Sequence, residues 1–118
     1  MKIGTWNVRG LLNESKLEDL EKDLNNYKLD ILTIQETHIR GTSKKLVGKN
    51  HTLYHTGPTT HSHHGVGIIV KNQLLGKFKV INERICQIEI ELNNKNELTV
   101  ISAYAPTLTN SLKKSTIS

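Results

Sequence analysis

The segment DILTIQ at residues 30–35 decides the fold, because it is apolar at nearly every position, as a β-strand covered on both faces should be. An earlier apolar and β-branched segment, KIGTWNV at residues 2–8, is stopped by Gly10 and predicts a strand that runs into a turn. The segment between the two predicted strands is long enough for a helix. These residues therefore predict a unit of strand, helix and strand, with a right-handed crossover if the strands are parallel.

The intervening helix is predicted from its start signal and its apolar spacing. SKLE at residues 15–18 fits a capping box. Apolar residues then fall on one face at helical spacing, while charged residues occupy the opposite face. The apolar face comprises Leu17, Leu20, Leu24 and Tyr27.

The second half of the chain is predicted to contain only strands. Residues 84–92 alternate best, with Cys86 among the side chains on the apolar face. The asparagine-rich turn at 93–96 joins them to an apolar strand at 98–105, which predicts a hairpin. Further strands are predicted at 52–56, 66–70 and 77–81, whereas the polar and basic residues 37–51 predict a loop. The chain is therefore assigned to the α/β class.

Composition excludes several classes of protein. The 118 residues include 16 Lys and Arg against 11 Asp and Glu, a formal charge of +5, and one cysteine, Cys86. A single cysteine excludes an internal disulfide framework and a thiolate zinc site. Because Cys86 alternates with core residues, we expect it to be a buried apolar residue. No segment has the length of apolar sequence that a membrane helix needs, and no signal region precedes the first strand. These features predict an intracellular protein, with the nucleus as one open location, and no membrane partner.

Three polar side chains stand where predicted strands end, which is where α/β sheets commonly build their sites. They are Asn7, Glu36 and Tyr104. Taken singly, each has an ordinary structural interpretation: Asn7 as a turn former, Glu36 as an exposed carboxylate, and Tyr104 as a core ring with its hydroxyl at the surface. Their combination is more informative than any one of them.

Four motifs contain these residues and occur in a fixed order: WNVRG at 6–10, IQETH at 34–38, HGVGIIV at 64–70 and YAPT at 104–107. Their order and approximate spacing resemble the start of the endonuclease/exonuclease/phosphatase superfamily. Within it the sequence is most similar to the apurinic-endonuclease-like domains of non-LTR retrotransposons and to craniofacial development protein 2-like proteins. The resemblance implies that residues 2–107 form the N-terminal half of a four-layer α/β/β/α sandwich, with one mixed sheet and one main amphipathic helix. Residues 108–118 are then expected to be a disordered tail.

The same resemblance implies roles for individual residues. Glu36 would bind Mg²⁺ or Mn²⁺, Asn7 would orient the catalytic groups and the scissile phosphate, and the Tyr104 hydroxyl would reach that phosphate. Three further residues would contact phosphate or nucleic acid: Arg9, His38 and Arg40. Arg9 departs from the apurinic endonucleases, which often carry a metal-proximal aspartate at this position. Because a guanidinium cannot bind the metal, metal affinity or substrate preference is expected to differ.

Family members also carry an Asp-x-Asn motif and an Asp-His pair in their second half. Neither follows Tyr104, because residues 105–118 contain no Asp, Glu or His. The resemblance therefore implies a truncated metal-dependent phosphodiesterase similar to a retrotransposon DNA endonuclease, inactive or weakly active alone and lacking the C-terminal half as its partner. Two alternatives stay open: a non-catalytic nucleic-acid-binding remnant, or the N-terminal half of a related phosphatase or lipid phosphodiesterase. About one sheet and its helix are expected, with one apolar sheet face left without its partner.

Two further clusters are less specific. His61, His63 and His64 could bind zinc, but loop histidines without a nearby carboxylate or cysteine make a poor site, and an exposed loop is favoured. The basic run at residues 44–49 predicts a solvated surface that could also follow a phosphate backbone.

Overall fold

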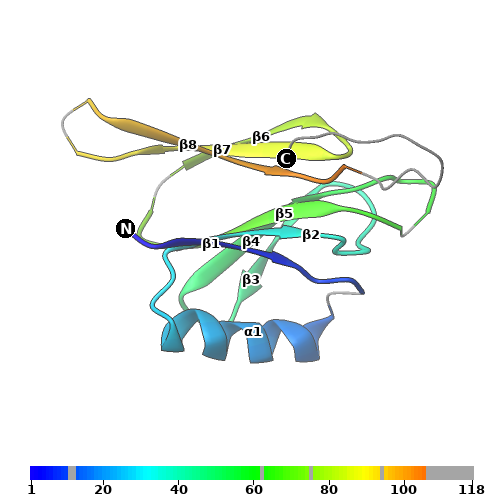
Figure 1. The fold of residues 1–118 in the computed structure, drawn as a ribbon, viewed down its shortest axis with the longest axis horizontal. Helices are drawn as coiled ribbons and strands as arrows, with labels where there is room; N and C mark the ends of the chain where they lie inside the picture. The colour runs from blue at the N-terminus through cyan, green and yellow to red at the C-terminus, as the bar shows by residue number, and fades with distance from the viewer. Residues whose placement is uncertain (11–12, 62, 75, 94, 106–118) are drawn as a thin grey trace.

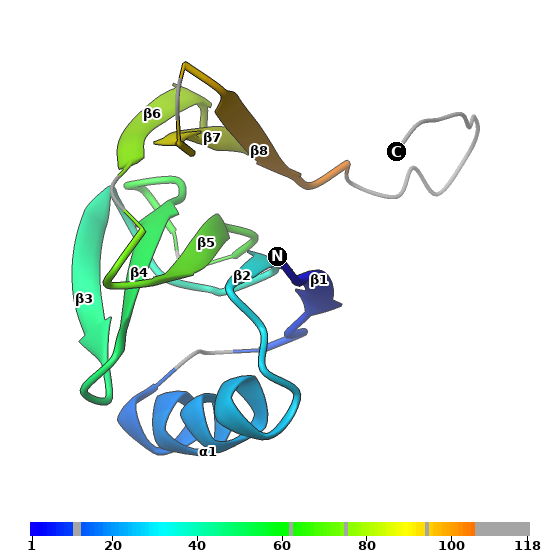
Figure 2. The same ribbon diagram turned by 90° about the vertical axis from the view of Figure 1, so that its left-hand side faces the viewer.

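The computed structural model describes residues 1–10, 13–61, 63–74, 76–93 and 95–105, and the expected tail at 108–118 lies outside these residues. The described part forms three layers in the order helix, sheet and sheet (Figures 1 and 2). Its elements are β1 (Ile3–Asn7), α1 (Glu14–Asn26), β2 (Ile31–Gln35), β3 (Ser43–Val47), β4 (His51–Thr56), β5 (Val66–Lys71), β6 (Gly76–Asn82), β7 (Ile85–Glu91) and β8 (Glu97–Ala103).

The first sheet has five strands in the order β1-β2-β5-β4-β3 and is mixed. Strands β1 and β2 are parallel, as the strand, helix and strand unit predicts, and the remaining pairs are antiparallel. The α/β class, the mixed sheet and its amphipathic helix are thus confirmed. Within the described residues, no helix has the length and apolar character that crossing a membrane requires.

The structure differs from the expected single sheet, because β6, β7 and β8 form a second, antiparallel sheet. This sheet lies over the face of the first sheet opposite α1 (Figure 2). Its inner residues pack against one face of β2 and β5, so the apolar face expected to lack a partner is covered. The buried residues of this layer are Ile31, Val66, Ile68, Val70, Cys86, Ile88, Ile90 and Val100. Burial of Cys86 is confirmed, and it raises the pKa of the thiol to about 12.

The other core layer lies between α1 and the first sheet. Leu17, Leu20 and Leu24 are buried there, as the helical spacing predicts, against residues that include Leu32 and Ile34 of β2. Since the neighbouring Ile31 packs on the second sheet, β2 is covered on both faces, which explains its continuous apolar sequence.

Two details of the helix prediction are wrong. Asn13, not Ser15, is the N-cap, because its Oδ1 accepts a hydrogen bond of 3.0 Å from the backbone N–H of Lys16. Tyr27 is 64% exposed rather than part of the apolar face, because it is the C-cap residue and follows the last helical turn.

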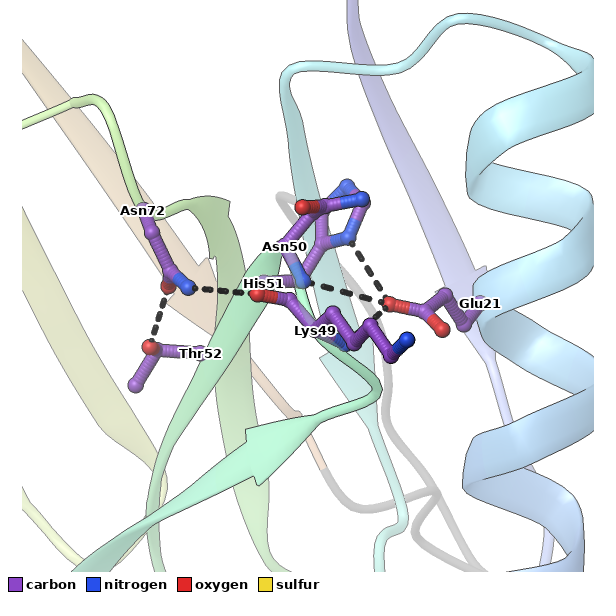
Figure 3. A network of polar contacts seen from close by, with 6 residues as sticks. All are labelled: Glu21, Lys49, Asn50, His51, Thr52 and Asn72. Carbon is purple, nitrogen blue, oxygen red and sulfur yellow. Dashed lines mark hydrogen bonds and ion pairs between the residues drawn. The ribbon is translucent and has the colours of Figure 1, made fainter.

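The basic segment predicted as a loop contains the edge strand β3, which pairs with β4. Most of its side chains are exposed, and lysines on an edge strand discourage pairing with other chains. The turn after β3 is joined to α1 by the Glu21 carboxylate (Figure 3). Glu21 Oε2 accepts hydrogen bonds from the backbone N–H groups of Lys49 (3.0 Å) and Asn50 (3.4 Å) and lies 3.6 Å from Nδ1 of the buried His51. The loop prediction failed because these long-range contacts stabilise a strand that its polar sequence does not indicate.

Candidate functional site

The ends of the two parallel strands β1 and β2 bring the first two predicted site residues together. Asn7 is the last residue of β1 and is in register with Gln35, the last residue of β2, so Glu36 follows at the same edge of the sheet. The Asn7 Nδ2 donates a hydrogen bond of 2.5 Å to Glu36 Oε2. The Asn7 Oδ1 accepts a hydrogen bond of 3.2 Å from the backbone N–H of Arg9, which fixes the amide in the turn.

Tyr104 reaches the same edge from the second sheet. It follows β8, and its backbone N–H donates a hydrogen bond of 2.9 Å to the carbonyl of Arg84. Burial raises the pKa of Tyr104, the charge of Glu36 raises this pKa further, and the charge of Arg84 lowers it. The Tyr104 ring also lies beside the His64 ring, and the His64 carbonyl accepts a hydrogen bond from the His38 N–H, so Tyr104 lies at the edge that carries Glu36.

Two polar residues without a predicted role hold the second sheet against this edge. The Ser102 hydroxyl of β8 donates a hydrogen bond of 2.9 Å to the Ile34 carbonyl of β2. Gln35 donates from Nε2 to Thr5 Oγ1 (3.3 Å) and to Ser102 Oγ (3.4 Å). The sequence could have indicated a role for Gln35 through its place in the IQETH motif. Nothing in the sequence around Ser102 marks it.

The backbone at this edge is held in an uncommon conformation. Arg9, Glu36 and His38 have φ of 56°, and His64 has φ of 67°, although none of them is glycine. Such residues cost on the order of 1–3 kcal/mol each and persist where surrounding contacts determine them. Here the His64 carbonyl accepts a hydrogen bond of 2.7 Å from the His38 N–H, and the Glu36 carbonyl accepts one of 3.3 Å from Gly10. This clustering at the motif residues supports a functional edge.

The predicted phosphate-contacting residues are spread around this edge. The backbone of Arg9 is tied to Asn7, whereas Arg40 is an exposed residue on the loop that leads to β3. The His38 ring lies 6.2 Å from the His63 ring, and the His64 ring lies 5.1 Å from the Tyr104 ring. His64 therefore belongs to the site more closely than the sequence indicated.

The fit to a divalent metal rests on Glu36. Within the part of the chain that the structure describes, no group of three or more His, Cys, Asp or Glu residues is arranged to hold a metal ion. A zinc centre at the histidine loop thus has no support from geometry. Mg²⁺, however, is usually held by one or two carboxylates together with water and substrate phosphate. The half-buried Glu36 carboxylate beside the Asn7 amide fits that chemistry for Mg²⁺ or Mn²⁺.

The tripeptide Asp23-Leu24-Asn25 has the letters of an Asp-x-Asn motif but lies within α1. Leu24 is buried in the layer beneath the first sheet, and Asp23 and Asn25 are exposed on the helix. This tripeptide is therefore part of an amphipathic helix and does not follow a strand at the site edge.

The fold and these polar strand ends define an α/β/β sandwich with a candidate site for a metal and a phosphate at one edge. Residues 4–110 match the Endonuclease/Exonuclease/phosphatase family, and the chain belongs to this family. It is also 28% identical, over 111 residues, to the RNA-directed DNA polymerase from mobile element jockey of Drosophila melanogaster. That match covers 90% of this chain and 12% of the relative, so the chain spans a small part of the relative's length.

Proposed function

We propose that this chain supplies the metal-binding and phosphate-orienting part of a Mg²⁺- or Mn²⁺-dependent phosphodiesterase that acts on DNA. The observation that carries the proposal is the hydrogen bond from Asn7 to Glu36 at the ends of two parallel strands, with Tyr104 beside them. Family membership supports a phosphoesterase, and the similarity to the RNA-directed DNA polymerase from mobile element jockey favours DNA as its substrate. We also propose a nuclear location, where such an endonuclease would meet chromosomal DNA.

Each residue has a role that its contacts support. Glu36 would hold the metal, which when bound neutralises negative charge on the phosphoryl oxygens. Asn7 fixes the direction of the Glu36 carboxylate through its amide, and the Tyr104 hydroxyl would donate a hydrogen bond to a phosphate oxygen. A tyrosine phenol is protonated at neutral pH, as this donor role requires, and burial raises the pKa of Tyr104 further.

Asn7, Glu36 and Tyr104 do not by themselves supply a base for the attacking water. Asn7 and Tyr104 are not bases at neutral pH, and Glu36 is assigned to the metal. We propose that the base and a charge-stabilising histidine come from a C-terminal half of the domain, acting as the partner of this chain. The 118-residue polypeptide is then expected to nick supercoiled plasmid weakly or not at all in Mg²⁺. Clear nicking that is lost in Glu36→Ala would overturn this part of the proposal.

The metal-binding role is tested by DNA affinity with and without Mg²⁺. Fluorescence anisotropy of a labelled duplex is expected to show tighter binding in Mg²⁺ for the natural sequence and no such gain for Glu36→Gln. Glu89→Gln is the matched control, because Glu89 is an exposed carboxylate on the second sheet. An equal gain in all three proteins would contradict a metal at Glu36.

The alternative is a non-catalytic nucleic-acid-binding remnant, which the charge of +5 favours. This alternative predicts a DNA affinity that falls with salt concentration, does not change when Mg²⁺ is added, and is the same in Glu36→Gln. The same anisotropy experiment separates the two functions.

A further inference from the structure

Arg84 lies directly beside Tyr104, although no sequence motif includes it. The register of β7 and β8 pairs Ile85 with Ala103 and Cys86 with Ser102. The hydrogen bond from the Tyr104 N–H to the Arg84 carbonyl, 2.9 Å, extends this register by one pair. Residues opposite each other on antiparallel strands have side chains on the same face. Arg84 and Tyr104 are therefore cross-strand neighbours.

The face that they share is the inner one, which looks toward the site edge. Cys86 and Ser102, two residues away on each strand, are buried on this face, and the Tyr104 ring packs against the core between the sheets. Arg84 stands one step beyond the end of that core and is exposed. The Arg84 side chain therefore starts from the rim of the candidate site and not from the outer face of the second sheet.

The turn that carries Arg84 has a fixed shape. The Asn82 Oδ1 accepts a hydrogen bond of 2.8 Å from the Arg84 N–H, and the pairing of β6 with β7 is irregular between Val80 and Asn82. A bulge of this kind redirects the side chains that follow it. The ion pairs formed within the described residues are His51–Glu21 and Lys71–Asp30, and neither involves Arg84.

We infer that Arg84 is a phosphate-binding residue that acts beside Tyr104 and contacts a phosphate of the DNA backbone at the site edge. This inference rests on the proposed function and extends it to a residue outside the family motifs quoted above. A guanidinium is always charged and offers paired N–H donors that match phosphate oxygens.

The inference is tested by salt-dependent binding of duplex DNA in EDTA, so that the result is independent of a metal at Glu36. One phosphate contact contributes about 0.9 to the slope of log affinity against log salt concentration. Arg84→Gln is expected to reduce the slope by about this amount, and Arg84→Lys to restore it. Lys79→Gln, which removes an exposed charge from β6, is the control and is expected to change the slope less.

A second readout follows the ionisation of Tyr104 by ultraviolet absorbance, with Tyr104→Phe identifying its transition among the three tyrosines. Arg84→Gln is expected to raise the pKa of Tyr104, because it removes the charge that lowers it. Each of three results would overturn the inference. They are equal slope changes in Arg84→Gln and Lys79→Gln, an unchanged pKa of Tyr104 in Arg84→Gln, and no measurable DNA binding. If the slope and the pKa respond as expected while Mg²⁺ has no effect on DNA affinity, the metal proposal fails and the role of Arg84 stands.

Discussion

Gly65 connects the site loop to β5, and its replacement by alanine tests how tightly that loop is held. Gly65 has φ of +96°, and its carbonyl accepts a hydrogen bond of 3.2 Å from the Thr37 N–H in the IQETH motif. An added Cβ would lie 2.4 Å from Thr37 Oγ1. Thr37 is fully buried and β-branched, so it has little freedom to move away.

The expected cost of Gly65→Ala has two sources. A left-handed backbone costs an L-residue about 1–2 kcal/mol, and forcing an extra methyl into a packed site costs about 1–3 kcal/mol. Together they predict a loss of about 2–5 kcal/mol in the free energy of unfolding. Since Thr37 follows Glu36, the displacement should also weaken Mg²⁺-dependent DNA binding.

Urea denaturation measures this cost, with a slope of about 1–3 kcal/mol per molar urea for a small protein. Gly41→Ala is the matched control, because Gly41 also has positive φ, +71°, but has no atom within 4 Å of its added Cβ. It should lose about 1–2 kcal/mol from the backbone alone. The double variant Gly65→Ala with Thr37→Ala should recover the steric part. Equal losses in the two glycine variants, without recovery in the double variant, would refute a tight contact between Gly65 and Thr37.

Three other perturbations follow from the packing. Glu21→Ala should lower the free energy of unfolding by about 1.5–3 kcal/mol in thermal or urea denaturation, because it removes the acceptor of the Lys49 and Asn50 N–H groups; an unchanged stability would show that this link is not formed. Burial lowers the pKa of His55, so its contribution to stability is present above about pH 6.5 and is lost as the pH falls below this value. His55→Gln should therefore lose less stability than the natural sequence between about pH 6.5 and about pH 5, and equal losses would contradict a buried neutral imidazole. Cys86, with a pKa raised to about 12, should react with iodoacetamide at neutral pH only when urea unfolds the chain; rapid labelling of the folded chain would argue against its burial.

Local sequence patterns were sufficient where a residue's environment is set by its neighbours along the chain. The continuous apolar sequence of β2 predicted a strand covered on both faces, and the leucine spacing of α1 predicted its buried face. Likewise, the alternation at residues 84–92 and the asparagine-rich turn predicted the hairpin of β7 and β8.

Long-range contacts explain what the patterns missed. β3 is polar along most of its length, and it forms because it pairs with β4 and because Glu21 binds the following turn. Strands β6, β7 and β8 form a separate sheet whose inner face packs on β2 and β5. The alternation of apolar residues predicts that these strands have one buried face, but it does not predict which sheet they join. Asn7, Glu36 and Tyr104 are predicted site residues from their motifs, whereas only the register of the strands brings Arg84 beside Tyr104.

The central claim, that Glu36 holds a divalent metal while Asn7 orients its carboxylate, is tested most directly by Mn²⁺, whose paramagnetism broadens nearby amide signals in nuclear magnetic resonance spectra. We predict that low Mn²⁺ broadens the signals of residues 7–10 and 36–38 first, and that Glu36→Gln abolishes this effect. Broadening centred on Glu89, Glu91 and Glu97, which line a hollow on the second sheet, with no change in Glu36→Gln, would contradict the claim.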